Sequence, residues 1–132
     1  MSLGTENETT EFVEGMDGLD DALKSVTAML NRYFKADVFI GVDVNGEPTG
    51  CEFSNGDTDR VLKRFVEVTN HMPEVSVVLE TDGSGRRYIH ISARGYEIPY
   101  SYKGWFYVRR SCTEKGSETE WIDSITCGMR HH

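Results

Sequence analysis

The stretch from Val38 to Gly50 limits the possible folds of this chain more than any other. An apolar run, VFIGV, is followed by Asp43 and then by the pair Asn45-Gly46. Asn-Gly between two strand-like runs is a strong signal for a β-hairpin, because a type I′ turn needs a positive φ at both central residues. We therefore predict a strand over 38–44, a tight turn at Asn45-Gly46 and a return strand.

Successive side chains of a strand point to opposite faces. One face of the predicted strand carries only valine and isoleucine, at positions 38, 40, 42 and 44. The other face carries Phe39, Gly41 and Asp43. A glycine inside a strand often marks a close approach by another backbone or by a ligand. Two interpretations stay open: a packed strand with a solvated Asp43, or a functional site around Gly41 and Asp43.

The size and composition of the chain indicate one domain with a hydrophobic core. Of its 132 residues, 38% are hydrophobic and 27% are charged, and this length suffices for a core. No apolar run approaches the roughly 20 residues of a membrane span, so we expect no membrane partner. Three cysteines without CxxC spacing argue for a reducing, cytoplasmic setting and against a disulfide framework or a zinc site.

Charge is unevenly distributed along the chain. The formal net charge is −8, and residues 1–23 contain seven acidic side chains and no basic one. Between residues 86 and 110, six basic side chains stand against a single acidic one, Glu97. The six are Arg86, Arg87, Arg94, Lys103, Arg109 and Arg110. An acidic protein can bind phosphates through one basic face of this kind.

The rest of the sequence alternates between helical and strand-like patterns. Apolar residues recur at helical spacing over 19–34 and again over 57–69. Strand-like runs cover 10–13, 75–80, 87–94 and 104–110, and Ile89, Ile91 and Ala93 are predicted to face the core. Two helices serving several hairpin-linked strands indicate an α+β fold. We predict a mixed, mostly antiparallel sheet with the helices on one face.

Four segments, in this order, resemble the Schlafen AlbA family, a divergent Alba-like DNA-binding module. They are Glu6 to Phe12, Ala28 to Arg32, Ile40 to Gly50 and Ile98 to Ser111. In turn they resemble the family's opening glutamates, its Ala-x-x-Asn helix end, its Ile-Gly-Val hairpin and its Pro-Tyr and Gly-x-x-Tyr-x-Arg ending. The sequence departs from the family at Val13, where lysine is usual, and at Phe34 to Asp37, which replace a Gly-Gly pair.

The resemblance implies a nucleic-acid-binding domain, as found in bacterial transcription regulators and RecG-like helicase-related proteins. Under this interpretation the nucleic-acid-binding residues are Arg86, Arg87, Arg94, Tyr100, Lys103, Arg109 and Arg110. The basic ones would contact phosphates, and Tyr100, with Tyr102 and Trp105, would stack on unpaired bases. This function requires no cofactor.

Two alternatives follow. In some Schlafen proteins two glutamates and an aspartate form a metal-dependent ribonuclease site, and the matching residues here are Glu6, Glu11 and Asp43. Such carboxylates can hold Mg²⁺ or Mn²⁺, which neutralises phosphate charge and activates water. The other alternative is a dimerisation or regulatory module, in which the aromatic strand 104–110 pairs with a second copy. The chain has no GxxxxGK[ST] motif, so we expect no ATP hydrolysis.

We expect the domain to cover residues 6–115. Residues 1–5 resemble a disordered, vector-derived leader, and His131-His132 resembles the remnant of an affinity tag. Residues 116–130 are predicted to extend toward a C-terminal domain of a larger cytoplasmic bacterial protein.

Overall fold

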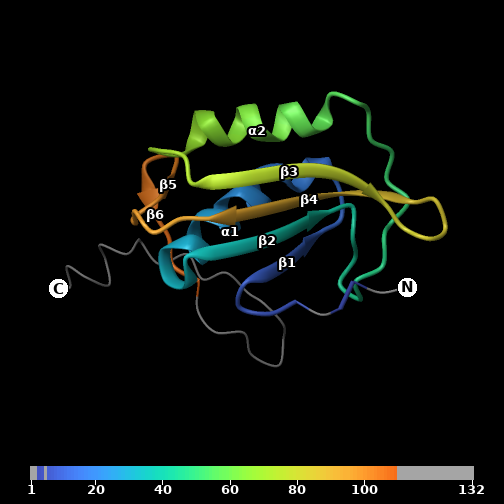
Figure 1. Cartoon of the computed structure of the whole chain (residues 1–132), viewed down its shortest axis with the longest axis horizontal. Coiled ribbons are helices and arrows are strands. Elements are labelled where there is room, and N and C mark those ends of the chain that lie inside the picture. Colours follow the sequence, from blue (N-terminus) through green and yellow to red (C-terminus); the bar gives the residue numbers. More distant parts are fainter. Residues whose placement is uncertain (1–2, 5, 110–132) are drawn as a thin grey trace.

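The structure, a computed structural model, describes residues 3–4 and 6–109. Its elements are β1 (Thr10–Val13), the 3-10 helix η1 (Met16–Gly18), α1 (Leu19–Tyr33), β2 (Lys35–Ile40), α2 (Asp57–Val68), β3 (Glu74–Thr81), β4 (Arg87–Arg94), β5 (Ser101–Tyr102) and β6 (Trp105–Phe106) (Figure 1). The two α-helices and the strands β1, β3 and β4 lie where the sequence predicts them.

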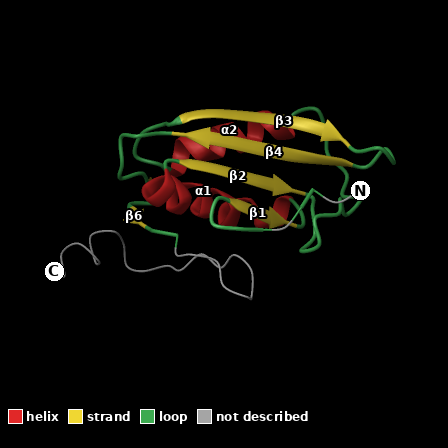
Figure 2. Cartoon of the chain, turned by 60° about the horizontal axis from the view of Figure 1, so that its bottom comes forward, coloured by secondary structure: helices red, strands yellow, loops and turns green. Residues whose placement is uncertain are grey.

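A four-stranded sheet in the order β1-β2-β4-β3 forms the centre of the described fold. β1 runs parallel to β2, whereas β4 pairs antiparallel with both β2 and β3. Helices α1 and α2 lie on the same face of this sheet (Figures 1 and 2). β5 and β6 form a separate two-stranded ribbon. The α+β fold with a mixed, mostly antiparallel sheet and two helices is confirmed.

The main hydrophobic core fills the space between the two helices and the sheet. Apolar residues three and four positions apart lie on one side of a helix, and alternate residues lie on one side of a strand. The fully buried members include Leu23, Val26, Met29 and Leu30 of α1, Val61 of α2, Val38 and Ile40 of β2, and Ile89 and Ile91 of β4. Burying each such side chain contributes about 1.5–3 kcal/mol relative to exposure.

The opposite face of the sheet, which α1 and α2 leave open, holds a smaller apolar cluster. Phe12, Val42 and Tyr88 are buried there, and Phe39 packs against them. Leu3 also packs on this cluster, held by a hydrogen bond of 2.7 Å from its amide to the carbonyl oxygen of residue 46. We refer to this side of the sheet as the open face.

The chain leaves the predicted strand at Gly41. β2 ends at Ile40, and Gly41 has a φ of +97°, which interrupts the alternation of faces. The amides of Gly41 and Val42 both donate to the carbonyl oxygen of Val13, at 2.6 and 3.1 Å, as in a local bulge. Val42 therefore joins the open-face cluster, and Val44 is 70% exposed. The prediction that residues 38, 40, 42 and 44 share one face is wrong beyond residue 40.

The chain reverses at Asn45-Gly46 as predicted, but the predictions of a type I′ turn and of a return strand are wrong. The amide of Gly46 donates to the Asp43 carbonyl at 2.9 Å, and the amide of Asp43 donates to the Glu47 carbonyl at 2.9 Å. Within 43–47 only Gly46 has a positive φ, of +81°, so this is not a type I′ turn. An isolated bridge between residues 42 and 48 stands in place of the return strand.

The predicted strand over 104–110 is also wrong in its described part. β6 covers only Trp105–Phe106 and pairs with β5. Lys103 and Gly104 connect the two with φ values of +52° and +86°, which is the pattern of a type I′ turn. Beyond β6 the chain crosses to α1, where the Arg109 amide donates to the Ala28 carbonyl at 3.1 Å. Arg110, the boundary at 115 and the predicted C-terminal segments lie outside the described residues.

Candidate nucleic-acid interface

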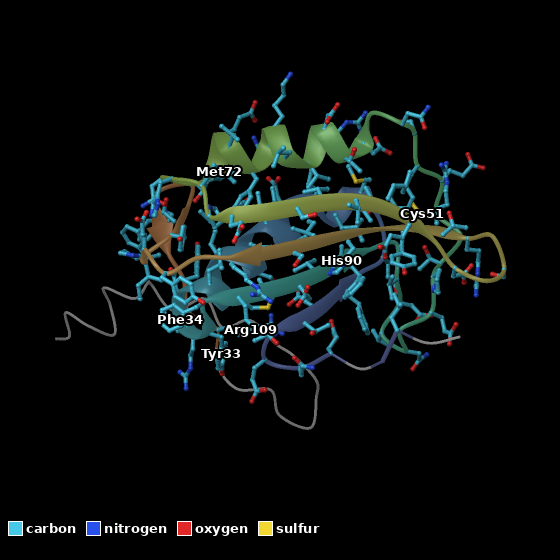
Figure 3. All side chains as sticks on the ribbon, viewed as in Figure 1. Tyr33, Phe34, Cys51, Met72, His90 and Arg109 are labelled. Carbon is cyan, nitrogen blue, oxygen red and sulfur yellow. The ribbon has the colours of Figure 1, made fainter. Side chains whose placement is uncertain are left out.

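Glu11 and Arg109, two predicted site residues from distant parts of the chain, form an ion pair. Glu11 lies on the helix-covered side of β1, where its Oε2 accepts a hydrogen bond from Ser25 Oγ at 2.9 Å. Its Oε1 lies 2.8 Å from Arg109 Nη1, and the Arg109 side chain is 0% exposed. Arg109 Nη2 also donates to the Asn7 carbonyl at 2.9 Å. Arg109 (Figure 3) therefore does not present its guanidinium at the surface of the described fold.

The three predicted carboxylates are engaged separately. Glu6 Oε2 accepts a hydrogen bond from the Phe12 amide at 2.8 Å. Asp43 Oδ1 accepts from the amides of residues 45 and 47, at 2.8 and 3.1 Å, and so closes the turn after β2. Among the described residues, no group of three His, Cys, Asp or Glu side chains could hold a metal ion. The structure does not bring Glu6, Glu11 and Asp43 together as a metal site.

Arg86 and Arg87 lie at the end of the sheet where β3 turns into β4. Arg86 Nη1 donates to the Pro48 carbonyl at 2.8 Å, and its Nη2 lies 3.4 Å from Asp82 Oδ2. Arg87 Nη2 donates to the carbonyl of Phe53. Both guanidinium groups thus hold the loop that follows β2 against the β3–β4 turn. Their polar contacts within the protein therefore stabilise the position of this loop.

Arg94 and Lys103 lie apart from this pair. Arg94 ends β4, about 23 Å from Arg87 at roughly 3.3 Å per residue along the strand. Lys103 Nζ lies 3.5 Å from Asp20 Oδ2, which Arg64 Nη2 also contacts at 2.9 Å. The hydrogen bond from Arg64 holds the pKa of the Asp20 carboxyl well below its usual range. The predicted basic residues up to Arg109 therefore do not form a single surface.

Tyr100, a predicted stacking residue, is a core residue with 2% exposure. Its amide donates to Asn31 Oδ1 at 2.6 Å, and Asn31 Nδ2 donates to the carbonyls of Tyr100 and Tyr107 at 2.9 and 2.8 Å. Tyr102 is also buried, and burial raises the pKa of its hydroxyl to about 12. Of the three aromatic candidates, Trp105 alone has its ring at the surface, at 58% exposure.

A different set of side chains gathers at the surface where α1 and β4 end. We call it the sheet-end patch: Tyr33, Phe34, Lys35, Arg94 and Tyr96, which line one surface pocket. α1 ends at Tyr33, and Phe34 follows with a left-handed φ of 66°, so that the chain enters β2 at once. Antiparallel pairing places Lys35 directly opposite Arg94. Figure 3 shows Tyr33 and Phe34 at the end of the sheet away from Cys51.

The sheet-end patch has an excess of positive charge. Lys35 and Arg94 belong to it, and the guanidinium of Arg32 lies 5.5 Å from the ring centroid of Tyr33. Within the described part of the chain, none of these three cations forms an ion pair, whereas Arg60, Arg64, Arg86, Lys103 and Arg109 all do. Like charges directly opposite each other on a sheet destabilise it. Two carboxylates of the protein offset part of this cost: Glu74 pairs in register with Arg94 on its other side, and Asp37 lies close enough to Lys35 for the lysine to help lower its pKa. A bound anion would relieve the repulsion further.

Between the two ends of the sheet, the open face carries a hydrogen-bonded pair of side chains, His90 and Asp37. His90, on β4 in the middle of the sheet (Figure 3), has its Nε2 2.8 Å from Asp37 Oδ1, and its imidazole stacks on the Phe39 ring with centroids 4.3 Å apart. The hydrogen bond from His90 holds the pKa of the Asp37 carboxyl below its ordinary value. Its place on β4, its hydrogen bond with Asp37 and its stacking on Phe39 give His90 a structural role in the described fold.

Comparison with known protein families relates the chain to the family that its sequence motifs resemble. The family model described as Schlafen, AlbA_2 matches residues 6–117. The chain belongs to the Schlafen AlbA_2 family. Membership supports a nucleic-acid-related domain at the level of the family. No curated protein matches the chain. Among the described residues, the structure contains no helix with the length and apolar character to cross a membrane.

Both departures from the family motifs have a structural explanation in this Schlafen AlbA_2 domain. Val13 packs against the main core, and its Cγ1 would lie 2.4 Å from a Cβ at Gly18, so its side chain occupies the space that Gly18 leaves free. Phe34 adopts a left-handed conformation that a glycine would adopt without strain. Arg32, Tyr33, Phe34, Lys35 and Tyr96 are absent from the predicted site residues. The one signal in the sequence was the replacement of the Gly-Gly pair.

Proposed function

We propose that this domain binds nucleic acid through the sheet-end patch, with Arg32, Lys35 and Arg94 contacting phosphates. The observation that carries the proposal is the grouping of three cations, without ion pairs among the described residues, beside exposed aromatic rings. Family membership supports the same function independently. A role in the cytoplasm within a larger DNA-binding bacterial regulator, as the resemblance implies, belongs to this proposal and rests on the family alone.

The electrostatics of the chain set the expected strength and salt dependence of binding. A formal net charge of −8 opposes long-range attraction of a polyanion. Short-range contacts by the three cations must therefore supply the affinity. Each neutralised phosphate releases counterions and contributes about −0.7 to −0.9 to the slope of log affinity against log salt. Three contacts predict a slope of roughly −2 to −3.

Fluorescence anisotropy with labelled oligonucleotides across a salt series tests the proposal. We expect Arg94→Ala and Lys35→Ala to weaken binding and each to reduce the magnitude of the salt slope by about 1. Lys63→Ala is the matched control, because Lys63 is an exposed cation on α2 outside the patch and the variant changes the net charge equally. The control should bind like the wild-type protein.

Two results would refute the proposal. Arg94→Ala and Lys35→Ala could bind with the wild-type affinity and salt slope, which would remove the patch from the interface. Alternatively, Lys63→Ala could weaken binding as much as they do. The loss of affinity would then come from the change in net charge and not from contacts within the patch. Thermal melts of the three variants show whether each is folded at the assay temperature.

A further inference from the structure

We infer that the ligand of the sheet-end patch is a single strand of nucleic acid, whose unpaired bases stack on Phe34 and Tyr96. This inference rests on the proposed function and specifies its ligand class. The two rings lie together, with centroids 5.4 Å apart and an interplanar angle of 31°. Phe34 is 39% exposed and Tyr96 is 75% exposed. The rings and the cations Lys35 and Arg94 line the same pocket.

The fold holds Tyr96 beside Phe34 through the residue between β4 and Tyr96. The amide of Gly95 donates to the Phe34 carbonyl at 3.1 Å, which ties the start of the loop to the end of α1. A Cβ at Gly95 would lie 2.1 Å from the hydroxyl oxygen of buried Tyr100. Only glycine therefore allows the loop to pass this close to the core. The position of the aromatic pair is fixed by the backbone rather than by the rings alone.

The backbone conformation of Phe34 makes a phenylalanine at this position less favourable for folding than a glycine, so we infer that its ring serves binding. A non-glycine residue in the left-handed region costs roughly 1–2 kcal/mol, and glycine is the usual residue just after a helix. Phe34 has a φ of 66° and still leaves a large part of its ring exposed. Residues held in strained backbone conformations cluster at active sites and ligand-binding sites.

The chemistry of the patch fits a single strand better than a duplex. The bases of a duplex are stacked on each other, so their faces are closed to a protein side chain. Unpaired bases can stack on aromatic rings with little regard to sequence, and each such contact contributes about 1–3 kcal/mol. Cations beside the rings would follow the phosphates of the same strand. Phe34, Tyr96, Lys35 and Arg94 provide both kinds of contact within one pocket.

The inference is tested by titrating the full chain with oligo(dT), oligo(U) and a DNA duplex of equal length. We expect either single strand to bind at least about tenfold more tightly than the duplex. Phe34→Gly and Tyr96→Leu should each weaken single-strand binding by about 5- to 150-fold, and a 2-aminopurine base in the strand should lose fluorescence only with the wild-type rings. Comparing oligo(dT) with oligo(U) shows whether DNA or RNA is preferred.

Phe34→Gly separates recognition from folding. Because glycine relieves the left-handed strain, this variant should melt at or above the wild-type temperature while binding more weakly. Leu62→Ala, at an exposed apolar residue of α2 outside the pocket, serves as the control and should bind normally. Trp105→Leu tests the exposed stacking residue that the sequence predicts outside the pocket.

Equal affinity for duplex and single strand, or wild-type binding by Phe34→Gly and Tyr96→Leu, would overturn the single-strand inference. The proposed function would survive that result if Arg94→Ala still weakened binding. Loss of single-strand binding in Trp105→Leu, with the other two variants unaffected, would place the stacking site elsewhere and also overturn the inference. No binding of any nucleic acid by the wild-type chain would overturn both proposals.

Discussion

Replacing Arg109 by methionine should lower the free energy of unfolding of the domain more than any substitution at the surface. The Arg109 guanidinium is 0% exposed, lies 2.8 Å from Glu11 Oε1 and donates to the Asn7 carbonyl at 2.9 Å. Its backbone amide donates to the Ala28 carbonyl of α1 at 3.1 Å. One residue thus connects the segment before β1, β1 itself, α1 and the chain beyond β6.

The expected cost follows from the burial of the pair. Removing one partner of a buried ion pair costs about 3–5 kcal/mol, because the remaining charge loses its compensation. A domain of this size is stable by roughly 5–15 kcal/mol, so Arg109→Met should remove a large fraction of the free energy of unfolding. Glu11→Gln removes the opposite charge. The double variant should then lose less than the sum of the two single losses, with a coupling energy of about 0.5–3 kcal/mol.

Urea unfolding followed by far-ultraviolet circular dichroism measures these free energies. Arg94→Met is the matched control, because Arg94 is an exposed arginine on a strand end and its loss should change stability by at most about 0.5 kcal/mol. A loss below about 1 kcal/mol in Arg109→Met, accompanied by weaker nucleic-acid binding, would refute this reasoning. Arg109 would then be a phosphate contact, as the sequence predicts.

Three further predictions concern stability. The hydrogen bond with His90 lowers the pKa of Asp37 in the folded protein. The pair therefore stabilises the fold at pH values above the ordinary carboxyl pKa of 3.8, and this stabilisation is lost as the pH falls through the lower pKa of the folded state. Asp37→Asn should therefore be less stable than wild type at pH 7 in urea unfolding, with a gap that narrows toward pH 2; a constant gap would contradict the linkage. Gly41→Ala should lower the melting temperature, because φ is +97° and a Cβ would meet an aromatic ring at 2.8 Å, whereas Gly83→Ala, in open space, should not. Asn31→Ala should lose about 1–3 kcal/mol per buried backbone group left unpaired, and hydrogen exchange at the Tyr100 amide should rise; unchanged exchange there would count against the assigned hydrogen bond.

Local sequence patterns predicted those elements whose formation depends on nearby residues. The spacing of Leu23, Val26 and Leu30 fixes the buried side of α1, and the alternation along 87–94 fixes which residues of β4 face the core. Both patterns are periodic, so they can be read without knowing any partner element. The turn between β3 and β4 also depends on nearby residues, because Asp82 Oδ1 accepts hydrogen bonds from the amides of residues 84 and 86, both at 2.9 Å.

The bulge at Gly41 could not be predicted, because its cause lies in distant segments. The Val13 carbonyl accepts from two successive amides, and the Phe53 ring fills the space beside Gly41. Once Gly41 takes a positive φ, Val42 turns to the open face, although its sequence position suggests the core. The same limitation explains why a type I′ turn occurs at Lys103-Gly104 and not at the stronger Asn-Gly signal. Tertiary contacts decide which short reversals extend into paired strands.

The candidate site shows how a basic stretch in a sequence differs from a basic surface. The arginines at 86, 87 and 94 belong to one strand and its preceding turn, and a strand separates its ends by about 3.3 Å per residue. Arg94 instead meets Lys35, 59 positions earlier, because β2 and β4 pair antiparallel with these residues in register. The left-handed turn at Phe34 is what lets β2 begin at residue 35, directly after α1. The segment from Phe34 to Asp37, which replaces the Gly-Gly pair of the family, therefore keeps the reversal and adds the Phe34 ring and the Lys35 charge beside Arg94 and Tyr96.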